Sequence, residues 1–276
     1  YHFSNKSLHY TDMKKFTSSF STKSIPGPND VIVSINDNKE ILFNKESKQF
    51  LQNNINVTGS AIKILSTDTH DVYLTNEIDE LSDNQIYLSK REIYPFLDET
   101  SLTIISRSFQ IYDWAFKQKF CSRHGTVLSE INDDLSKSCP DCSRDLFPKM
   151  SPCILVSVTF KNKILLVRHN NEIRNLSTVI AGFVELGETL EECVIREVYE
   201  EVGLRIKDIK YVSSQSWPFP NQLMVAFKAV SEHDELTLDN HEILDASWYS
   251  KDELPTIPPE PSLSNFLIRE TVNSLI

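Results

Sequence analysis

Short apolar runs separated by turn residues fill the first hundred positions and predict a strand-rich N-terminal segment. Two of these runs, at 31–35 and 41–43, flank a polar Asp-Asn pair, which is typical of a β-hairpin. From Leu102 to Phe116 the apolar residues recur every three or four positions, which predicts an amphipathic helix. No residue pattern in this part of the chain indicates chemistry, so we expect it to be scaffold.

The second half of the chain has a different pattern. Apolar runs at 154–158 and 164–167 flank Lys-Asn-Lys and predict a second hairpin. A helix is expected from about 190 to 202, then strands at 223–230 and 246–249, a proline-rich turn and a final helix. Strands mixed with two helices predict an α/β layered domain.

Charge and cysteine content narrow the function. Thirty-nine acidic residues against 28 basic ones give the 276-residue chain a formal net charge of −11. This balance argues against a broad nucleic-acid-coating or membrane-docking surface, and no apolar run approaches the roughly 20 residues that span a bilayer. Five cysteines make a poor disulfide framework and indicate a reducing, intracellular compartment.

The predicted helix at 190–202 has clear end signals. Thr189 and Glu192 form a capping box at its start. Gly203 stands where a left-handed C-terminal cap belongs. An apolar stripe of Ile195, Val198 and Val202 is expected to face the core.

Three glutamates share one face of this helix: Glu197, Glu200 and Glu201. Like charges at this spacing repel by a few tenths of a kcal/mol per pair, roughly, unless a cation neutralises them. Mg²⁺ and Mn²⁺ prefer such oxygen ligands and also bind substrate phosphates. Arg196 could hold one carboxylate by a forked pair. The alternative is a solvated acidic face.

The segment 182–204 favours the metal site, because it matches Gly-x5-Glu-x7-Arg-Glu-U-x-Glu-Glu-x-Gly-U, with U bulky and apolar, at every specified position. It resembles the Nudix hydrolases. The resemblance implies an α/β/α sandwich that hydrolyses a nucleoside diphosphate linked to another moiety. It also implies Glu197 and Glu201 as metal ligands, Glu200 as a ligand or base, and the carbonyl of Ala181 as a further ligand.

A second motif, Ser-Gln-Ser-Trp-Pro-Phe-Pro-Asn-Gln at 214–222, offers rigid aromatic faces that could grip a base or pack into the core. It resembles Ser-Gln-Pro-Trp-Pro-Phe-Pro-x-Ser of the NADH pyrophosphatase branch, with Ser216 and Gln222 as departures. Glu242 falls where that branch has another metal carboxylate, although a surface glutamate is the alternative. The residues expected at the substrate are Phe183, Gln215, Ser216, Trp217, Pro218, Phe219, Pro220, Asn221, Gln222 and Ser264.

Two close pairs, Cys121-x2-His124 and Cys139-x2-Cys142, could converge on one tetrahedral Zn²⁺. Four protein ligands would leave no open position, so the zinc would be structural. A redox pair at Cys139 and Cys142, or free thiols, are alternatives. The resembled branch carries a four-cysteine zinc ribbon at this place, and His124 departs from it.

These observations predict an N-terminal domain of unclear role (1–117), a zinc ribbon (118–148) and a Nudix catalytic domain (149–276). The expected reaction is metal-dependent hydrolysis of NADH or NAD⁺ to NMN(H) and AMP. Alternatives are removal of NAD caps from RNA 5′ ends, hydrolysis of ADP-ribose or dinucleoside polyphosphates, and a catalytically idle Nudix binding module. The resemblance also suggests a homodimer and a cytoplasmic or peroxisomal location, and the composition argues against a membrane partner.

Overall fold

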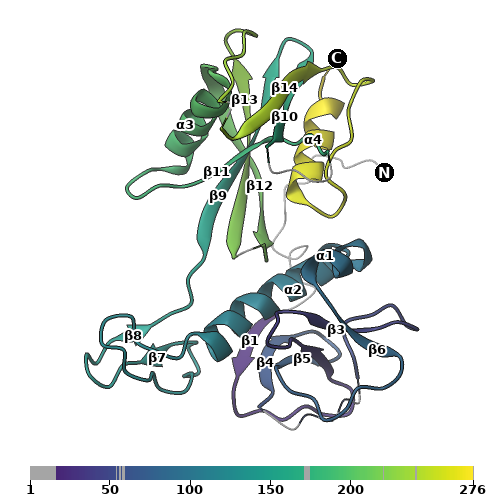
Figure 1. The fold of residues 1–276 in the computed structure, drawn as a ribbon, viewed down its shortest axis with the longest axis vertical. Coiled ribbons are helices and arrows are strands. Elements are labelled where there is room, and N and C mark those ends of the chain that lie inside the picture. The colour runs from purple at the N-terminus through teal and green to yellow at the C-terminus, as the bar shows by residue number, and fades with distance from the viewer. Residues whose placement is uncertain are drawn as a thin grey trace. The chain divides into compact units, whose positions relative to one another are not determined.

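The computed structural model describes residues 17–53, 55, 57, 60–170, 175–219, 221–239 and 241–275. The chain divides into two compact units (Figure 1). One contains Tyr1–Leu97 with Arg107–Lys149, and the other contains Asp98–Ser106 with Met150–Ile276. No helix formed by the described residues is both long and apolar enough to cross a membrane.

The N-terminal unit is built on a four-stranded sheet in the order β1-β4-β5-β2 and a separate pair, β3-β6. The strands are β1 (Thr17–Ser21), β2 (Val31–Ser34), β3 (Ile41–Asn44), β4 (Ile62–Ser66), β5 (Asp71–Thr75) and β6 (Gln85–Leu88). The prediction that 31–35 and 41–43 pair as a β-hairpin is wrong. β2 pairs in parallel with β5, β3 pairs with β6, and a single bridge joins Ile35 to Ile41. All four residues of β2 are buried, which is the pattern of a parallel strand covered on both faces.

The helix expected from Leu102 to Phe116 is confirmed. It is α2 (Glu99–Tyr112), continued by a π-turn, η3 (Asp113–Lys117). The short helices α1 (Lys90–Ile93) and η2 (Tyr94–Phe96) precede it. After it, β7 (Lys137–Ser138) and β8 (Asp145–Leu146) form a small antiparallel pair.

The C-terminal unit holds a six-stranded sheet in the order β12-β13-β9-β10-β14, with β11 paired to β9. Its strands are β9 (Ser151–Phe160), β10 (Lys163–His169), β11 (Ile180–Phe183), β12 (Ile206–Trp217), β13 (Gln222–Ser231) and β14 (Ile243–Tyr249). The predicted hairpin is confirmed as β9–β10. The motif at 214–222 is largely strand, because its first four residues end β12 and its last residue begins β13. β12 lies at the sheet edge, where polar residues obscure the apolar pattern.

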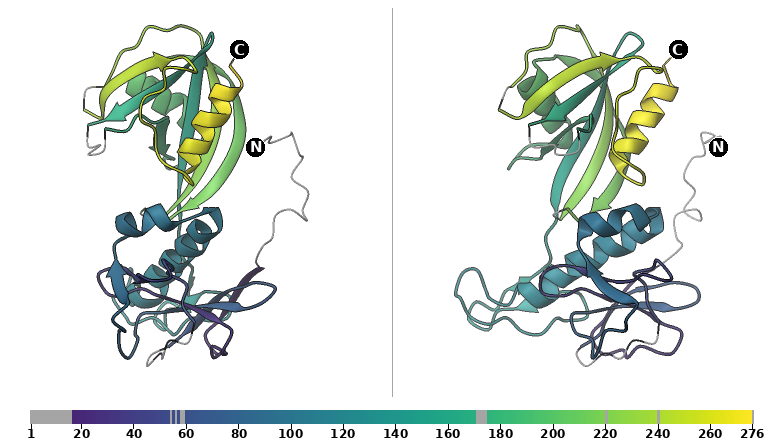
Figure 2. Two further views of the ribbon diagram at one scale, coloured as in Figure 1. Left: turned by 90° about the vertical axis from the view of Figure 1, so that its right-hand side faces the viewer. Right: turned by 45° about the vertical axis from the view of Figure 1, so that its right-hand side comes forward.

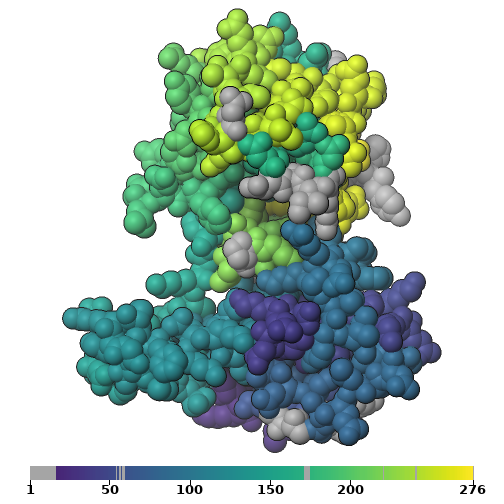
Figure 3. All heavy atoms as spheres, in the orientation of Figure 1, coloured from purple at the N-terminus to yellow at the C-terminus, as the bar shows by residue number. Residues whose placement is uncertain are grey.

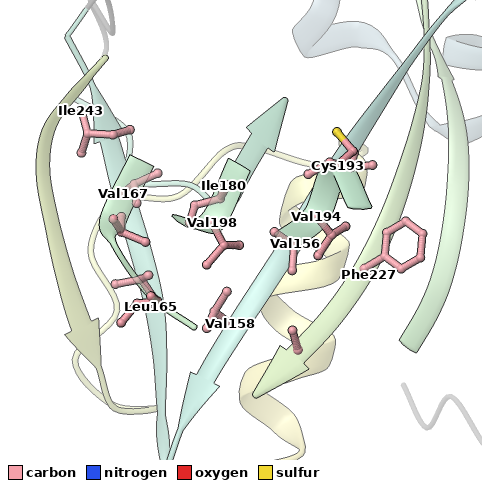
Figure 4. Packing of buried hydrophobic residues seen from close by; sticks show 14 of the residues in the cluster. Val156, Val158, Leu165, Val167, Ile180, Cys193, Val194, Val198, Phe227 and Ile243 are labelled. Atoms are coloured by element: carbon pink, nitrogen blue, oxygen red, sulfur yellow. The ribbon is translucent and has the colours of Figure 1, made fainter. Parts of the chain in front are cut away.

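Two helices cover opposite faces of this sheet (Figures 1 and 2). Side chains alternate between the faces of a strand, so Val156 of β9 packs under α3 (Leu190–Val202), whereas Leu155 packs under α4 (Leu263–Asn273). Figure 4 shows the hydrophobic core between α3 and the sheet, in which Val194 and Val198 of α3 lie near residues of the strands. The expected α/β/α sandwich is therefore confirmed.

Both predicted ends of α3 are confirmed. The Thr189 hydroxyl accepts from the Glu192 N–H at 3.2 Å, and the Glu192 carboxylate accepts from the Thr189 N–H at 2.8 Å. Gly203 follows with φ +71°. The prediction that Ile195 faces the core is wrong, because Ile195 is 49% exposed. The buried face instead consists of Cys193, Val194, Val198 and Val202, together with two glutamates.

Gly203→Ala should lower the free energy of unfolding by about 2 kcal/mol. An added Cβ has to adopt the left-handed conformation, which costs roughly 1 kcal/mol, and it would also lie 2.9 Å from the Thr237 Cβ. Urea denaturation measures the loss. Gly187→Ala is the matched control, because Gly187 also has positive φ but open space around it. Equal losses in the two variants would contradict the crowding at Thr237.

Candidate active site and metal cluster

The candidate active site lies where helix α3 packs against strand β11. Glu197 and Glu201 are buried, at 9% and 2% exposure, whereas Glu200 on the same helix is exposed. A Cβ at Gly182 of β11 would overlap the carboxyl group of Glu197. Glycine is therefore required at 182 because the Glu197 carboxyl group lies directly against the strand backbone. Ala181, the expected carbonyl ligand, is the preceding residue of β11.

Arg196 ties this helix to the loop that precedes it. Its Nε and Nη2 donate to the two carboxylate oxygens of Glu188, at 2.7 and 3.0 Å, which confirms a forked pair. Nη2 also donates to the Phe183 carbonyl at 3.0 Å. Nη1 donates to Glu197 at 2.8 Å and to Glu200 at 3.0 Å. The guanidinium lowers the pKa of Glu188 to about 2, so this loop anchor stays ionised at neutral pH.

Glu201 is the most perturbed carboxylate of the site. Burial, followed by the neighbouring charges of Glu197, Glu242 and Asp239, raises its pKa to about 8. Its Oε2 atom is buried without a hydrogen-bond partner among the described residues. Burial also raises the pKa of Glu197. The face is therefore not simply solvated.

A divalent cation fits this cluster. Burying a carboxylate without a partner is unfavourable, and the orphaned Glu201 oxygen is the atom that a ligand ion would satisfy. The carboxylates of Glu197, Glu200 and Glu201 offer oxygen ligands, which suit Mg²⁺, Mn²⁺ or Ca²⁺ better than softer ions.

A loop after β13 adds two acidic residues to the site. The Asp239 N–H donates to the Glu201 carbonyl at 3.0 Å, and the Glu242 N–H donates to the Asp239 carbonyl at 3.2 Å. Both side chains contribute to the raised pKa of Glu201. Glu242 was expected near the metal, whereas Asp239 was not. The only sequence signal for Asp239 was its position three residues before Glu242.

The aromatic residues expected at the substrate fall into two environments. Phe183 follows Gly182 on β11 and is 49% exposed. Trp217 at the end of β12 packs partly against the core under α4, and its ring lies 5.0 Å from that of Phe219 at 64°. Pro218 between them is buried, and Pro220 lies outside the described residues. The alternative that the aromatic residues pack into the core therefore applies in part to Trp217, whereas the Phe183 ring is open to a ligand.

Gln215 holds the start of α4. Its Nε2 donates to the Pro261 carbonyl at 2.9 Å, and its Oε1 accepts from the Leu263 N–H at 2.9 Å. The Ser264 hydroxyl, one residue further, lies 2.6 Å from the Thr178 hydroxyl. The motif at 214–222 thus fixes the segment that carries Ser264.

The remaining predicted substrate residues surround the β12–β13 turn. Ser216 pairs with Leu223, and Gln222 pairs with Trp217 and is buried. The Asn221 carbonyl accepts from the Ser151 N–H at 3.0 Å.

A hollow of about 450 Å³ lies beside the loop at 185–188. Its walls are Glu185, Leu186, Gly187, Glu188, Glu192, Ile195 and Arg196. Neither Glu197 nor Glu201 lines it, so we do not assign the substrate to this hollow.

The four predicted thiol and imidazole ligands converge in the N-terminal unit. One ligand atom from each of Cys121, His124, Cys139 and Cys142 lies within 4.8 Å of the others. The Sγ atoms of Cys121 and Cys139 are 3.9 and 3.6 Å from His124 Nδ1. Backbone N–H groups of Arg123 and His124 lower the pKa of the Cys121 thiol to about 7. A thiolate stabilised in this way is a ready metal ligand, so the cluster could bind a metal ion.

The chain is similar in sequence to known proteins. Residues 151–268 match the NUDIX domain model. The chain is 36% identical to the NAD-capped RNA hydrolase NudC of Photobacterium profundum over 244 residues, which cover 88% of this chain and 89% of that protein. It is 38% identical to the Escherichia coli protein of the same name over 64% of this chain and 68% of that protein. A NUDIX hydrolase structure from Nitrosomonas europaea is 23% identical, with a TM-score of 0.49, over 56% of this chain and 91% of that chain. The chain therefore belongs to the Nudix family, in the group that contains the NudC proteins.

Proposed function

We propose that this protein hydrolyses the diphosphate linkage of an NAD moiety, either in NADH and NAD⁺ or at the 5′ end of NAD-capped RNA. The observation that carries the proposal is the buried pair Glu197 and Glu201, with one orphaned carboxylate oxygen, packed against strand β11, which also carries the exposed ring of Phe183. The first group suits a cation that binds phosphate, and the second suits a planar ring. The NudC relatives are named NAD-capped RNA hydrolases, which supports hydrolysis of the same diphosphate linkage.

The proposed catalytic ion is Mg²⁺ or Mn²⁺, held by Glu197, Glu201 and the carbonyl of Ala181, with Glu200 and Glu242 close by. Such an ion supplies positive charge for the diphosphate and acidifies a water molecule. The chain's own residues do the rest. Arg196 holds Glu197 and Glu200 in place. Glu200 or Glu201 accepts the proton from the attacking water.

For the substrate, we propose that Phe183 stacks on one ring of the dinucleotide. Gln215 acts mainly by holding Pro261 and Leu263, since its carbonyl oxygen and one amide N–H contact the backbone there. Trp217 and Phe219 then form the wall of the substrate site. The other motif residues (Ser216, Pro218, Pro220, Asn221, Gln222 and Ser264) remain predicted contacts or supports.

We propose structural Zn²⁺ for the Cys/His cluster. Three sulfurs and one imidazole match a closed tetrahedral zinc site and leave no position for a substrate. The cluster joins the hairpin at 117–128 to the β7–β8 pair.

One comparison separates the rival functions. The purified protein is incubated with NADH, NAD⁺, ADP-ribose and NAD-capped RNA, with Mg²⁺ or Mn²⁺, and kcat/KM is measured for each. A preference for ADP-ribose, or no turnover with any of the four, would contradict the proposal. The latter result would favour the idle binding module. The homodimer and the cytoplasmic or peroxisomal location stay predictions.

Glu201→Gln should reduce kcat at least about 100-fold, because it removes one charge from the proposed metal ligands. The same change should raise the free energy of unfolding of the metal-free protein by about 1–3 kcal/mol at pH 8, because a buried, unpaired carboxylate is removed. Gain of stability with loss of activity distinguishes a ligand from a packing residue. A variant with normal kcat would refute the assignment.

The pH dependence of stability provides a second test of Glu201. Its pKa of about 8 in the folded chain exceeds the ordinary value of 4.5. Between these values the folded chain binds more protons than the unfolded chain, so the stability of the metal-free protein should fall as pH rises from about 5 to about 8. Glu201→Gln should flatten this fall, as measured by urea denaturation in chelator.

The zinc proposal predicts one Zn²⁺ per chain that survives dialysis. Cys139→Ser should release it and lower the melting temperature, because the metal binding energy there contributes to folding. Elemental analysis and thermal denaturation measure both effects. Cys153→Ser is the matched control, since Cys153 is buried outside the cluster. A stable, active preparation without zinc would overturn this proposal.

Phe183→Ala should reduce kcat/KM for NADH by roughly 5- to 150-fold, which corresponds to a stacking energy of about 1–3 kcal/mol. A minimal diphosphate ester has no ring to stack and should lose much less. The melting temperature should change little, because the ring is 49% exposed. Equal losses on both substrates together with a lower melting temperature would instead assign Phe183 to packing.

A further inference from the structure

The segment 117–128 is unusually basic for this chain. It contains Lys117, Lys119 and Arg123 and no acidic residue, whereas the whole chain has a net charge of −11. We call this segment the basic hairpin. In Figure 3 it belongs to the teal lobe at the lower left of the N-terminal unit.

The basic hairpin has a buried side and an exposed side. Phe120 and Val127 face each other in an antiparallel bridge, supported by the Leu128 N–H that donates to the Lys119 carbonyl at 2.9 Å. Phe120 is 55% exposed and Val127 is 62% exposed, whereas Cys121 and Leu128 are buried. The metal cluster and its small core thus hold the hairpin from one side and leave the Phe120 ring open on the other.

Two of the three positive side chains of the basic hairpin are available to a ligand. Lys117 is paired with Asp37 at 2.7 Å. Lys119 and Arg123 are exposed, and neither forms an ion pair within the ranges that the structure describes. An exposed aromatic ring and unpaired cations on one short segment suit single-stranded nucleic acid, which proteins bind through base stacking and phosphate contacts.

We propose that the basic hairpin binds the single-stranded body of an RNA whose capped end is the substrate. Lys119 and Arg123 contact phosphates, and an unpaired base stacks on Phe120. The inference rests on the proposed function only in identifying the RNA as a capped one. A protein partner fits less well, because the exposed large apolar side chains of this segment are Phe120 and Val127, whereas stable protein interfaces have larger apolar cores.

The test uses the whole protein with zinc bound and two variants, Phe120→Ala and the double variant Lys119→Gln/Arg123→Gln. Matched controls are Tyr211→Ala, an exposed ring on β12, and Lys161→Gln/Lys163→Gln at the β9–β10 turn. Fluorescence anisotropy measures binding of an uncapped, unstructured RNA of about 20 nucleotides, and kcat/KM is measured for NADH and for the NAD-capped form of the same RNA. Zinc content and melting temperature verify folding.

Phe120→Ala should weaken RNA binding at least about 5-fold. The double charge variant should reduce the slope of log affinity against log salt by about 1.4, because each phosphate that a side chain neutralises on a single strand adds about 0.7 to that slope. Capped RNA should lose kcat/KM in parallel, while NADH and the control variants stay unchanged.

Unchanged RNA binding in both hairpin variants, or equal losses in the controls, would overturn the inference. Unchanged RNA binding with reduced self-association would assign the hairpin to a protein interface instead. The unmodified protein could also turn over neither NADH nor capped RNA, while the hairpin variants still bind uncapped RNA more weakly than it does. That result would support an RNA contact at the hairpin and refute the proposed function.

Discussion

The candidate active site depends on the burial of two carboxylates of one helix against the backbone of a strand. Glu197 and Glu201 lie on the face of α3 that also carries Val194 and Val198 into the core. Helix packing therefore forces the carboxylates into a low-dielectric environment, where charge is unfavourable. The raised pKa of Glu201 reports this cost. A site of this kind sacrifices stability in the metal-free state and gains affinity for a cation.

Arg196 limits how far this repulsion can distort the site. It contacts Glu197 and Glu200 through one nitrogen, and Glu188 and the Phe183 carbonyl through the others. The same side chain thus fixes carboxylates of the helix and the strand end that carries the exposed ring. Lysine could not reproduce this arrangement, because it lacks the planar fork. Charge placement and ring placement are consequently coupled through one guanidinium.

The sequence predicted α3 well because its determinants are local. The capping box of Thr189 and Glu192 and the left-handed Gly203 act within a few residues, and the structure contains both. Ile195 was misassigned because the buried glutamates shift the inward face away from it, and apolar periodicity cannot register a buried charge. The family resemblance gave the carboxylates a metal role that spacing alone left open.

Features set by pairing distant segments were not predictable from the sequence in this way. β2 joins β5 and not the neighbouring β3, because a long-range parallel contact buries it completely. β12 was missed since an edge strand needs no continuous apolar pattern. Asp239 reaches the site because its N–H bonds to the Glu201 carbonyl at the end of α3. A single sequence gives no local sign of such a backbone contact.

The two candidate metal centres differ in what their ligands leave unsatisfied. At the Cys/His cluster, four soft or borderline ligands lie within 4.8 Å of one another and can close a tetrahedron, so an ion there has no free position. On α3, the hard oxygen ligands Glu197 and Glu200 share one nitrogen of Arg196, and one Glu201 oxygen has no partner within the described residues. An ion at the second centre must complete its coordination with water or with substrate oxygens. The first ligand set therefore suits folding and the second suits catalysis, a division that follows from ligand chemistry and burial.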